Sequence, residues 1–364
     1  MLTEAYEVPF EARVYQSYLS GIKNHWRTSL YQQVVKEAQS LQAEDIEKIE
    51  SSMLLSPSYQ LYAWQERMTQ QFKYIGRWGI KTILEQSRKE LIDILQTADQ
   101  IATDRLKLNP ECALPDYVGG IDVHQVPSGL GRDALNTWLM VWYQKGLTFA
   151  GGNPNALVEW YADLLVNLAK DANCEVKTVL DMGCTLGRST MSIKKKMPSA
   201  NVFGCDVCEA PLRYGHLLAQ ENGVDITLCQ ENAEKLTFGD ETFDMVASHW
   251  LFHELPPDAV VNVIHEAARV LKPGGIFAIY DMCKVPGGTI GEWLHKGMAI
   301  RNNEPYALPL VHTDLAKIMT DAGFSNIQFK TTSPDWPQET EPTEIMKNRY
   351  MFMSLYSGVI QKNI

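Results

Sequence analysis

The sequence lacks the defining features of several protein classes. No apolar run reaches the ~18 residues that a membrane-spanning helix needs, and no basic stretch followed by an apolar core opens the chain as a signal peptide would. Lys and Arg number 33 against 44 Asp and Glu, so the formal net charge is −11. A field of that sign repels phosphate backbones. We therefore expect no membrane or nucleic-acid partner and, by default, a cytoplasmic location.

Cysteine is too sparse and too irregular for a disulfide framework. The seven cysteines are an odd number scattered among apolar residues, which suits reduced thiols. Cys205 and Cys208 form a C-x-x-C, but no second pair completes a zinc site. His253-Glu254 is not the start of an H-E-x-x-H zinc motif, because Pro257 stands where the second histidine would be. The sequence therefore predicts no metal site.

Glycine and proline are also scarce between residues 10 and 106. Leu61, Trp64, Met68 and Phe72 recur there at spacings of three and four, which is typical of an amphipathic helix. We expect a helical N-terminal domain over residues 1–110, with four or five helices that form a lid or a homodimer contact. Residues 111–152 are instead rich in glycine, proline and aromatic residues. A connecting segment of this composition is expected where the chain covers a pocket.

From residue 153 onward, strand-like and helix-like segments alternate. The expected strands cover residues 176–182, 202–207, 226–230, 243–248 and 276–281, and the expected helices cover residues 156–170, 188–197, 211–222 and 257–271. This alternation predicts an α/β domain over residues 153–364, with a doubly wound, mostly parallel sheet and helices on both faces. Ligands of such sheets bind at the carboxyl ends of the strands.

A glycine-containing loop, residues 181–187, joins the first of these strands to a helix. Glycines let a backbone approach a ligand closely, and a helix N-terminus offers unpaired N–H groups. The loop does not fit a phosphate loop, because its glycines are four apart and Arg188 follows. It does not fit the dinucleotide fingerprint either, because Thr185 stands between Gly183 and Gly187. Asp206 ends the second strand, where an acid can accept hydrogen bonds from ribose hydroxyls.

Together these segments resemble the class I S-adenosylmethionine (SAM)-dependent methyltransferase family. The resemblance is carried in order by residues 181–187, 202–206, 232–236, 243–246 and 268–275, and it covers about residues 156–362. It implies a seven-stranded sheet whose last strand, residues 351–360, runs antiparallel. It also implies SAM as the cofactor. The cofactor-binding residues expected from it are Asp181, Gly183, Cys184, Thr185, Gly187, Asp206, Val207, Asn232, Ala233 and His249.

The acceptor side of the site is less marked in the sequence. His253 follows the fourth strand, where this family places substrate-facing residues, and as a general base it would give a pH limb near ~6.5. We expect His253 and Asp281 to be catalytic. The expected substrate-binding residues are His124, Trp250, Glu254, Trp293, Tyr306 and His312.

The function expected from the sequence is methyl transfer to a small-molecule acceptor. Whether the acceptor atom is oxygen, nitrogen, sulfur or carbon stays open, because the leaving group of SAM is neutral and the enzyme mainly aligns the reactants. Two alternatives also stay open at this point. One is a nucleotide-binding oxidoreductase, and the other is a non-catalytic protein that binds SAM or a partner.

Overall fold

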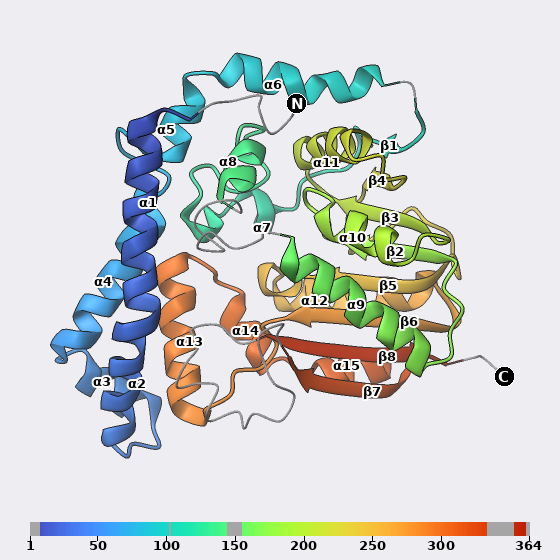
Figure 1. The fold of residues 1–364 in the computed structure, drawn as a ribbon. Coiled ribbons are helices and arrows are strands. Elements are labelled where there is room, and N and C mark those ends of the chain that lie inside the picture. The colour runs from blue at the N-terminus through green and yellow to red at the C-terminus, as the bar shows by residue number, and fades with distance from the viewer. Residues whose placement is uncertain (1–7, 102, 144–154, 333–352, 362–364) are drawn as a thin grey trace.

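The protein is described by a computed structural model that covers residues 8–101, 103–143, 155–332 and 353–361. An eight-stranded sheet, with the order β1-β4-β3-β2-β5-β6-β8-β7, forms its centre (Figure 1). The strands are β1 (Leu106–Lys107), β2 (Thr178–Met182), β3 (Asn201–Asp206), β4 (Thr227–Gln230), β5 (Phe243–His249), β6 (Leu271–Asp281), β7 (Phe324–Thr331) and β8 (Ser354–Ile360).

The doubly wound, mostly parallel sheet expected from the sequence is confirmed. Strands β1 to β6 pair in parallel, and β8 runs antiparallel between β6 and β7. The number of strands differs from the expected seven, because Leu106 and Lys107 add a short edge strand beside β4. This strand comes from the segment that was assigned to the helical domain, so the sheet reaches across the expected boundary at residue 110.

Helices cover both faces of the sheet because each face of its central strands is apolar. The helices α9 (Ala156–Asp171), α10 (Arg188–Lys196) and α11 (Glu209–Glu221) pack on one face through a core that includes Tyr161, Leu212 and Val179. The helices α12 (Pro257–Val270) and α15 (Leu315–Asp321) pack on the other face. Apolar strands covered on both faces are typical of parallel sheets.

The N-terminal region forms a helical layer beyond the sheet domain (Figure 1). Its α-helices are α1 (Phe10–His25), α2 (Tyr31–Ser40), α3 (Ile46–Met53), α4 (Pro57–Phe72), α5 (Ile80–Glu85) and α6 (Arg88–Gln96), and a π-helical turn, Trp26–Leu30, joins α1 to α2. Later in the chain come the helices α8 (Asn136–Tyr143), α13 (Gly288–Asn302) and α14 (Ala307–His312). Trp293 and Leu294 of α13 lie in the apolar core of α1 to α4. This helix therefore ties the helical layer to the sheet domain.

A buried ion pair crosses the same junction. The guanidinium of Arg301 on α13 donates to the carboxylate of Glu66 on α4, and Glu66 is fully buried. Arg301 also donates to the hydroxyl of Tyr59 at 3.3 Å, and its backbone carbonyl accepts from Arg67 at 3.1 Å. Several polar contacts thus fix α4 against α13.

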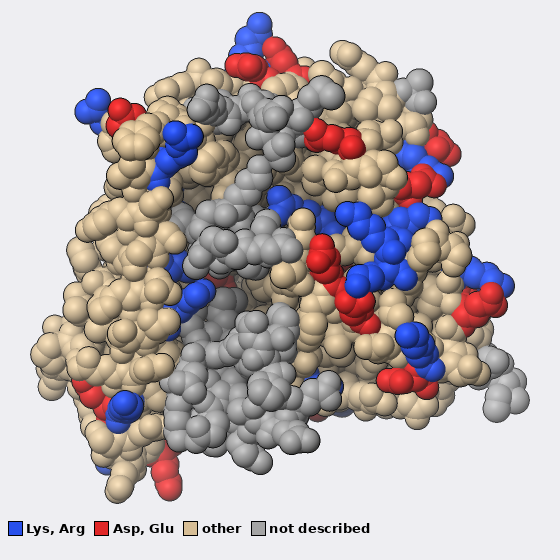
Figure 2. All heavy atoms as spheres, in the orientation of Figure 1, with Lys and Arg blue, Asp and Glu red and all other residues tan. Residues whose placement is uncertain are grey.

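The outer face of the helical layer is unusually apolar. Phe10, Val14 and Tyr18 lie four residues apart on α1 and are 67%, 51% and 64% exposed. Figure 2 shows few charged side chains over α1 to α4, whereas acids and bases intermingle over the sheet domain. The expected homodimer contact through this layer stays a prediction. Across the described ranges, no helix is both long and apolar enough to cross a bilayer.

Candidate active site

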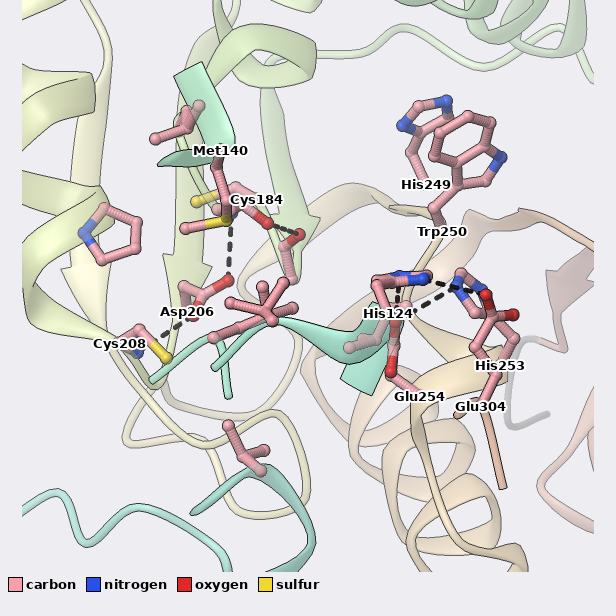
Figure 3. Close-up of a pocket in the computed structure, with 18 of the residues that line it drawn as sticks. His124, Met140, Cys184, Asp206, Cys208, His249, Trp250, His253, Glu254 and Glu304 are labelled. Carbon is pink, nitrogen blue, oxygen red and sulfur yellow. Dashed lines mark hydrogen bonds and ion pairs between the residues drawn. The ribbon is translucent and has the colours of Figure 1, made fainter. Parts of the chain in front are cut away.

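A cavity of about 360 Å³ lies where the carboxyl ends of β2 to β6 face the helical layer. Its lining includes the residues that follow these strands, among them Gly183, Asp206, Glu231, Trp250 and Met282. Trp26, Gln70 and Met140 line it from the helical layer and α8. Figure 3 shows two chemically different ends, with Asp206 at one and a group of histidines and carboxylates at the other.

The loop after β2 has the close, left-handed turn that a ligand-binding backbone needs. Gly183 has φ +70°, and a Cβ atom built on it would lie 2.9 Å from Cδ1 of Leu251. Thr185, which stands where the family often has glycine, adopts φ +48°. A left-handed conformation is uncommon for such a residue and carries strain, and strained residues concentrate at functional sites. Gly183, Cys184 and Thr185 all line the cavity.

Asp206 is placed as expected for a ribose-binding acid. Its Oδ2 accepts from the Thr185 N–H at 3.0 Å, and its Oδ1 accepts from the Cys208 N–H at 2.9 Å. Asp206 lines the cavity, and a carboxylate there can accept hydrogen bonds from the hydroxyls of an adenosine ribose. Burial raises the pKa of Asp206, and these backbone donors oppose the shift. Val207, Asn232 and Ala233 continue the lining from this carboxylate.

Replacing Asp206 with alanine should weaken SAM binding by ~1–3 kcal/mol, because buried ribose hydroxyls would lose their acceptor. Titration calorimetry with SAM and with its demethylated product measures the change, and NAD serves as the negative ligand. Full SAM affinity in the variant, or tight NAD binding by the wild type, would remove Asp206 and this loop from a SAM site.

Asp181 lies behind the loop and does not line the cavity. Its Oδ2 accepts from the hydroxyls of Ser189 and Thr190 at 2.6 and 2.7 Å, which fixes the start of α10. Its buried Oδ1 has no hydrogen-bond partner among the described residues. Asp181 was expected to bind the cofactor, and that expectation stays a prediction. Burial raises the pKa of Asp181 to about 6, although Ser189 and Thr190 oppose the shift.

The raised pKa of Asp181 gives a pH-dependent stability. Because the folded state holds this proton more tightly than the unfolded state, the contribution of Asp181 to stability is complete below about pH 4 and is lost as pH rises through about 6. Asp181→Asn should therefore gain up to ~3 kcal/mol over the wild type between pH 4 and pH 7.5. Urea unfolding at both pH values measures the gain.

Asp244 supplies a control of opposite sign for this comparison. Its pKa is lowered despite burial, through hydrogen bonds from Lys272 and Thr178. A lowered pKa gives a contribution that is present above about pH 4 and is lost only at lower pH. Asp244→Asn should thus lose nearly the same stability at pH 4 and pH 7.5. If the difference between Asp181→Asn and the wild type were also independent of pH, the raised pKa would be refuted.

An aromatic stack forms part of the cavity lining. His249 stacks between Trp250 and Tyr280, with ring centroids 5.1 and 5.6 Å apart and interplanar angles of 10° and 2°. Burial lowers the pKa of His249 to about 4, so the ring is neutral at pH 7. Trp250 has φ +61°, and its buried Nε1 has no hydrogen-bond partner among the described residues. Both side chains line the cavity, where this indole N–H is available to a ligand.

The far end of the cavity contains a chain of alternating carboxylates and histidines. Oδ1 of Asp281 lies 2.7 Å from Nδ1 of His253, and Nε2 of His253 lies 3.3 Å from Oε1 of Glu254. The same Glu254 oxygen lies 2.9 Å from Nε2 of His124, whose Nδ1 is 2.8 Å from Oε1 of Glu304. Asp281, itself fully buried, also accepts from the Phe252 N–H at 2.8 Å. Figure 3 shows His124, His253, Glu254 and Glu304 converging at this end.

The carboxylates control the charge of both imidazoles. Burial alone would lower the pKa of His124, but Glu304 and Glu254 raise it to about 9. In His253, Asp281 and Glu254 likewise overcome the effect of burial and hold the pKa well above its usual range. Burial would raise the pKa of Glu254, but the two histidines hold it below its usual range. The pH limb expected near ~6.5 for His253 therefore moves upward.

Several residues expected at the site lie outside the cavity lining. Trp293 packs on Tyr59, with ring centroids 4.9 Å apart, because α13 turns its apolar side toward the helical layer. Tyr306 lies edge-on to Tyr117, and His312 is 55% exposed beside Glu292. Gly187 begins α10 against Leu228 with φ +66°. Asp281 reaches the cavity only through its contact with His253.

Glu304 is the main site residue that the sequence analysis missed. It follows α13, is 4% exposed and lines the cavity beside His124. Its other oxygen, Oε2, is buried without a hydrogen-bond partner among the described residues. The available signal was its place in the insertion after β6, where acceptor-binding residues were expected. The helical layer adds apolar residues that no motif marked, such as Trp26, Leu139 and Met140.

Comparison with known proteins places this site in a family. A methyltransferase-domain profile matches residues 179–275. An uncharacterised methyltransferase from Synechocystis is 33% identical over 150 residues, which are 41% of this chain and 68% of that protein. This chain belongs to the class I SAM-dependent methyltransferase family. SAM is accordingly its cofactor, and the glycine loop and Asp206 lie at the positions where the resemblance placed cofactor-binding residues.

Other relatives are matched over less of their length. A ubiquinone biosynthesis O-methyltransferase from Pseudomonas syringae is 37% identical over 29% of this chain and 44% of its own. The second relative, a protein from Haemophilus influenzae, is matched over 59% of its length. Among solved structures, a phosphoethanolamine N-methyltransferase from Haemonchus contortus bound to SAM has a TM-score of 0.47, with 17% identity over 69% of this chain and 61% of that chain.

Proposed function

We propose that this protein transfers the methyl group of SAM to a small molecule held inside the cavity. The observation that carries the proposal is the continuity of the cavity, which joins Thr185 and Asp206 at one end to His253 and Glu254 at the other. A cofactor at the first end and an acceptor at the second would share one enclosed space. Holding two reactants in line in this way supplies much of the rate of a displacement reaction.

The enclosure of the far end favours a small acceptor. The side chains of His253 and Glu304 are only 6% and 5% exposed, and those of Glu254 and His124 are 22% and 26% exposed. Trp26 and Tyr74 line the cavity from the helical region, and Met140 of α8 lines it near Asp206 (Figure 3). An acceptor must therefore enter the cavity, which suits a metabolite better than a chain segment of a macromolecule. The expected lid role of the helical layer fits this arrangement.

The chain's own residues have separable tasks in this proposal. SAM supplies a methyl group on a positively charged sulfur, which leaves as a neutral thioether. Asp206 and the loop after β2 bind and orient the nucleoside, and the apolar cover excludes water. His253, fixed by Asp281, and Glu254 position the acceptor and control its proton. The oxidoreductase alternative lacks support, because the loop has Thr185 where a dinucleotide fold needs its second glycine.

Transfer of labelled methyl tests the proposal. The full-length protein is incubated with methyl-labelled SAM and a cell extract, and the products are separated into low-mass, protein and nucleic-acid fractions. We expect label to enter the low-mass fraction only. Label in the protein or nucleic-acid fraction would contradict the small-molecule acceptor. Tight SAM binding with no transfer to any fraction would favour the non-catalytic alternative.

A further inference from the structure

The polar end of the cavity has a donor set that the methyl-transfer chemistry does not by itself require. His124, His253 and Glu254 each offer one ligand atom, and these atoms lie within 4.8 Å of one another. They come from separate parts of the chain, His124 from the turn Val123–Gln125 and the other two from the turn Phe252–Glu254. Two imidazoles and one carboxylate are a recurrent ligand set for zinc and for iron(II) and related divalent metals.

Both histidines are oriented as metal ligands usually are. The Nδ1 atoms of His253 and His124 face the buried carboxylates of Asp281 and Glu304, at 2.7 and 2.8 Å. A carboxylate on Nδ1 fixes the tautomer with its proton on that nitrogen and directs Nε2 toward a metal. Here both Nε2 atoms point to one oxygen of Glu254, at 2.9 and 3.3 Å. This doubled carboxylate–histidine arrangement converges on a single point.

The short contacts on Glu254 need a positive charge, either on the two imidazoles or between the three groups. If Nδ1 carries the imidazole proton, Nε2 presents a lone pair, and so does the Glu254 oxygen that it faces. Two lone pairs at 2.9 Å repel each other unless a positive charge lies between them. A proton on each imidazole meets this need, and so does one divalent ion shared by all three groups. Metal–nitrogen and metal–oxygen bonds of ~2.0–2.2 Å fit ligand atoms about 3 Å apart.

The backbone of His124 is held in an uncommon conformation at the cavity. His124 has φ 51° and ψ 19°, and Gln125 after it has φ 58°. Two successive non-glycine residues in the left-handed region are costly, and such strain persists where the surrounding structure enforces it. Here Gln125 donates to the carbonyl of Arg301, and Asn303 donates to the carbonyl of Asp122 at 2.8 Å. These contacts hold His124 over the cavity. The free, buried Oε2 of Glu304 adds further negative charge at the same place.

We propose that His124, His253 and Glu254 bind one divalent transition-metal ion, whose open positions face the cavity and take an acceptor through a hydroxyl or enol oxygen. The choice of an oxygen acceptor rests on the proposed methyl transfer, whereas metal binding does not. The acceptor gives up its O–H proton to bulk water as it binds the cation, and in the transfer step its oxygen forms a bond to the methyl carbon. The carbon–sulfur bond breaks, and its electron pair stays on sulfur. The cation favours the deprotonated oxygen, as metals do for bound water.

Metal binding is tested with the purified full-length protein, stripped with a chelator and titrated with Co²⁺ alone. Calorimetry and the visible absorption of cobalt should give one site per chain. His124→Asn should weaken binding by at least ~100-fold, because loss of even an outer partner costs ~10–100-fold. Asparagine tolerates the left-handed backbone of residue 124, which favours folding of the variant. Glu254→Gln should fail to bind Co²⁺. The Co²⁺ affinity of Glu304→Gln should lie between that of the wild type and that of His124→Asn.

The exposed His312 provides the matched control, because it pairs with Glu292 away from the cavity. His312→Ala should bind Co²⁺ like the wild type, and circular dichroism should show that every variant is folded. Absence of a saturable site in the wild type, or equal binding by folded His124→Asn, would overturn the metal site. If Co²⁺ binds but the chelator-treated protein still methylates its acceptor at the full rate, the acceptor role of the metal is overturned while the proposed methyl transfer stands.

Discussion

Methyl transfer by His253→Ala should be slower than wild type by ~10²–10⁴-fold, the range found when a group that handles the reacting proton is lost. SAM affinity should stay within about twofold of wild type. His253 is 5% exposed, faces the cavity and is fixed by Asp281 at 2.7 Å. Whether it moves the acceptor's proton or binds a cation, its removal leaves the far end of the cavity without its central imidazole. The contacts of Asp206 lie at the other end.

Turnover and unfolding must be measured on the same preparation of this variant. His312→Ala, at an exposed histidine, should keep both wild-type turnover and wild-type melting temperature. Asp281 keeps backbone donors from Phe252 and Met282, at 2.8 and 2.7 Å, when the imidazole is removed, which limits the loss of stability. Unchanged turnover per folded molecule in His253→Ala would show that His253 only packs.

Arg301→Ala should lower the free energy of unfolding by ~3–5 kcal/mol, because it removes the guanidinium that pairs with the buried carboxylate of Glu66. Burial raises the pKa of Glu66, and Arg301 opposes the shift. Without Arg301, the fully buried Glu66 loses its guanidinium partner, although Lys23 still favours its charged form. The same change removes a contact between α4 and α13, so the cover of the cavity loosens as well. Urea unfolding at pH 7 measures the loss.

Two further variants separate the charge effect from simple truncation. Removing both charges of a buried pair is often nearly neutral, so Glu66→Gln combined with Arg301→Met should be more stable than Arg301→Ala. Lys317→Ala breaks an exposed pair with Asp321 on α15 and should leave the free energy of unfolding nearly unchanged. Equal losses for the exposed and the buried pair would show that the Glu66–Arg301 pair does not anchor the helical layer.

The sequence predicted the sheet domain well where its signals were local. The strands that became β2 to β5 had apolar runs next to turn residues, and their bounds were within two residues of those observed. The strand expected over residues 276–281 begins instead at Leu271, as β6, where Gly274 has φ +83° and the register with β5 shifts near Phe243. The two-residue strand β1 has no periodicity, so only its pairing with β4 reveals it.

Contacts between distant segments were beyond the sequence pattern. His253 and Glu254 were marked by their place after a strand, but nothing local showed that His124 and Glu304 would meet them. Trp293 was expected to wall the acceptor site, because the insertion after β6 commonly does so in this family. The structure directs this side of α13 to the helical core, where burial of its indole against Tyr59 stabilises the layer instead. Which core an apolar side chain such as Trp293 joins depends on which apolar surface lies nearest in the fold.

Methyl transfer to a small molecule is tested most directly by mass spectrometry. A metabolite extract is incubated with the protein and with SAM that carries a deuterated methyl group. In the proposed reaction, the cofactor and the acceptor bind at opposite ends of one cavity. The wild type should therefore give a small-molecule product that carries the labelled methyl. The same product should fall sharply with Asp206→Ala at limiting SAM and with His253→Ala even at saturating SAM. A labelled product formed equally by all three proteins, or no labelled small molecule from the folded, SAM-binding wild type, would contradict the account.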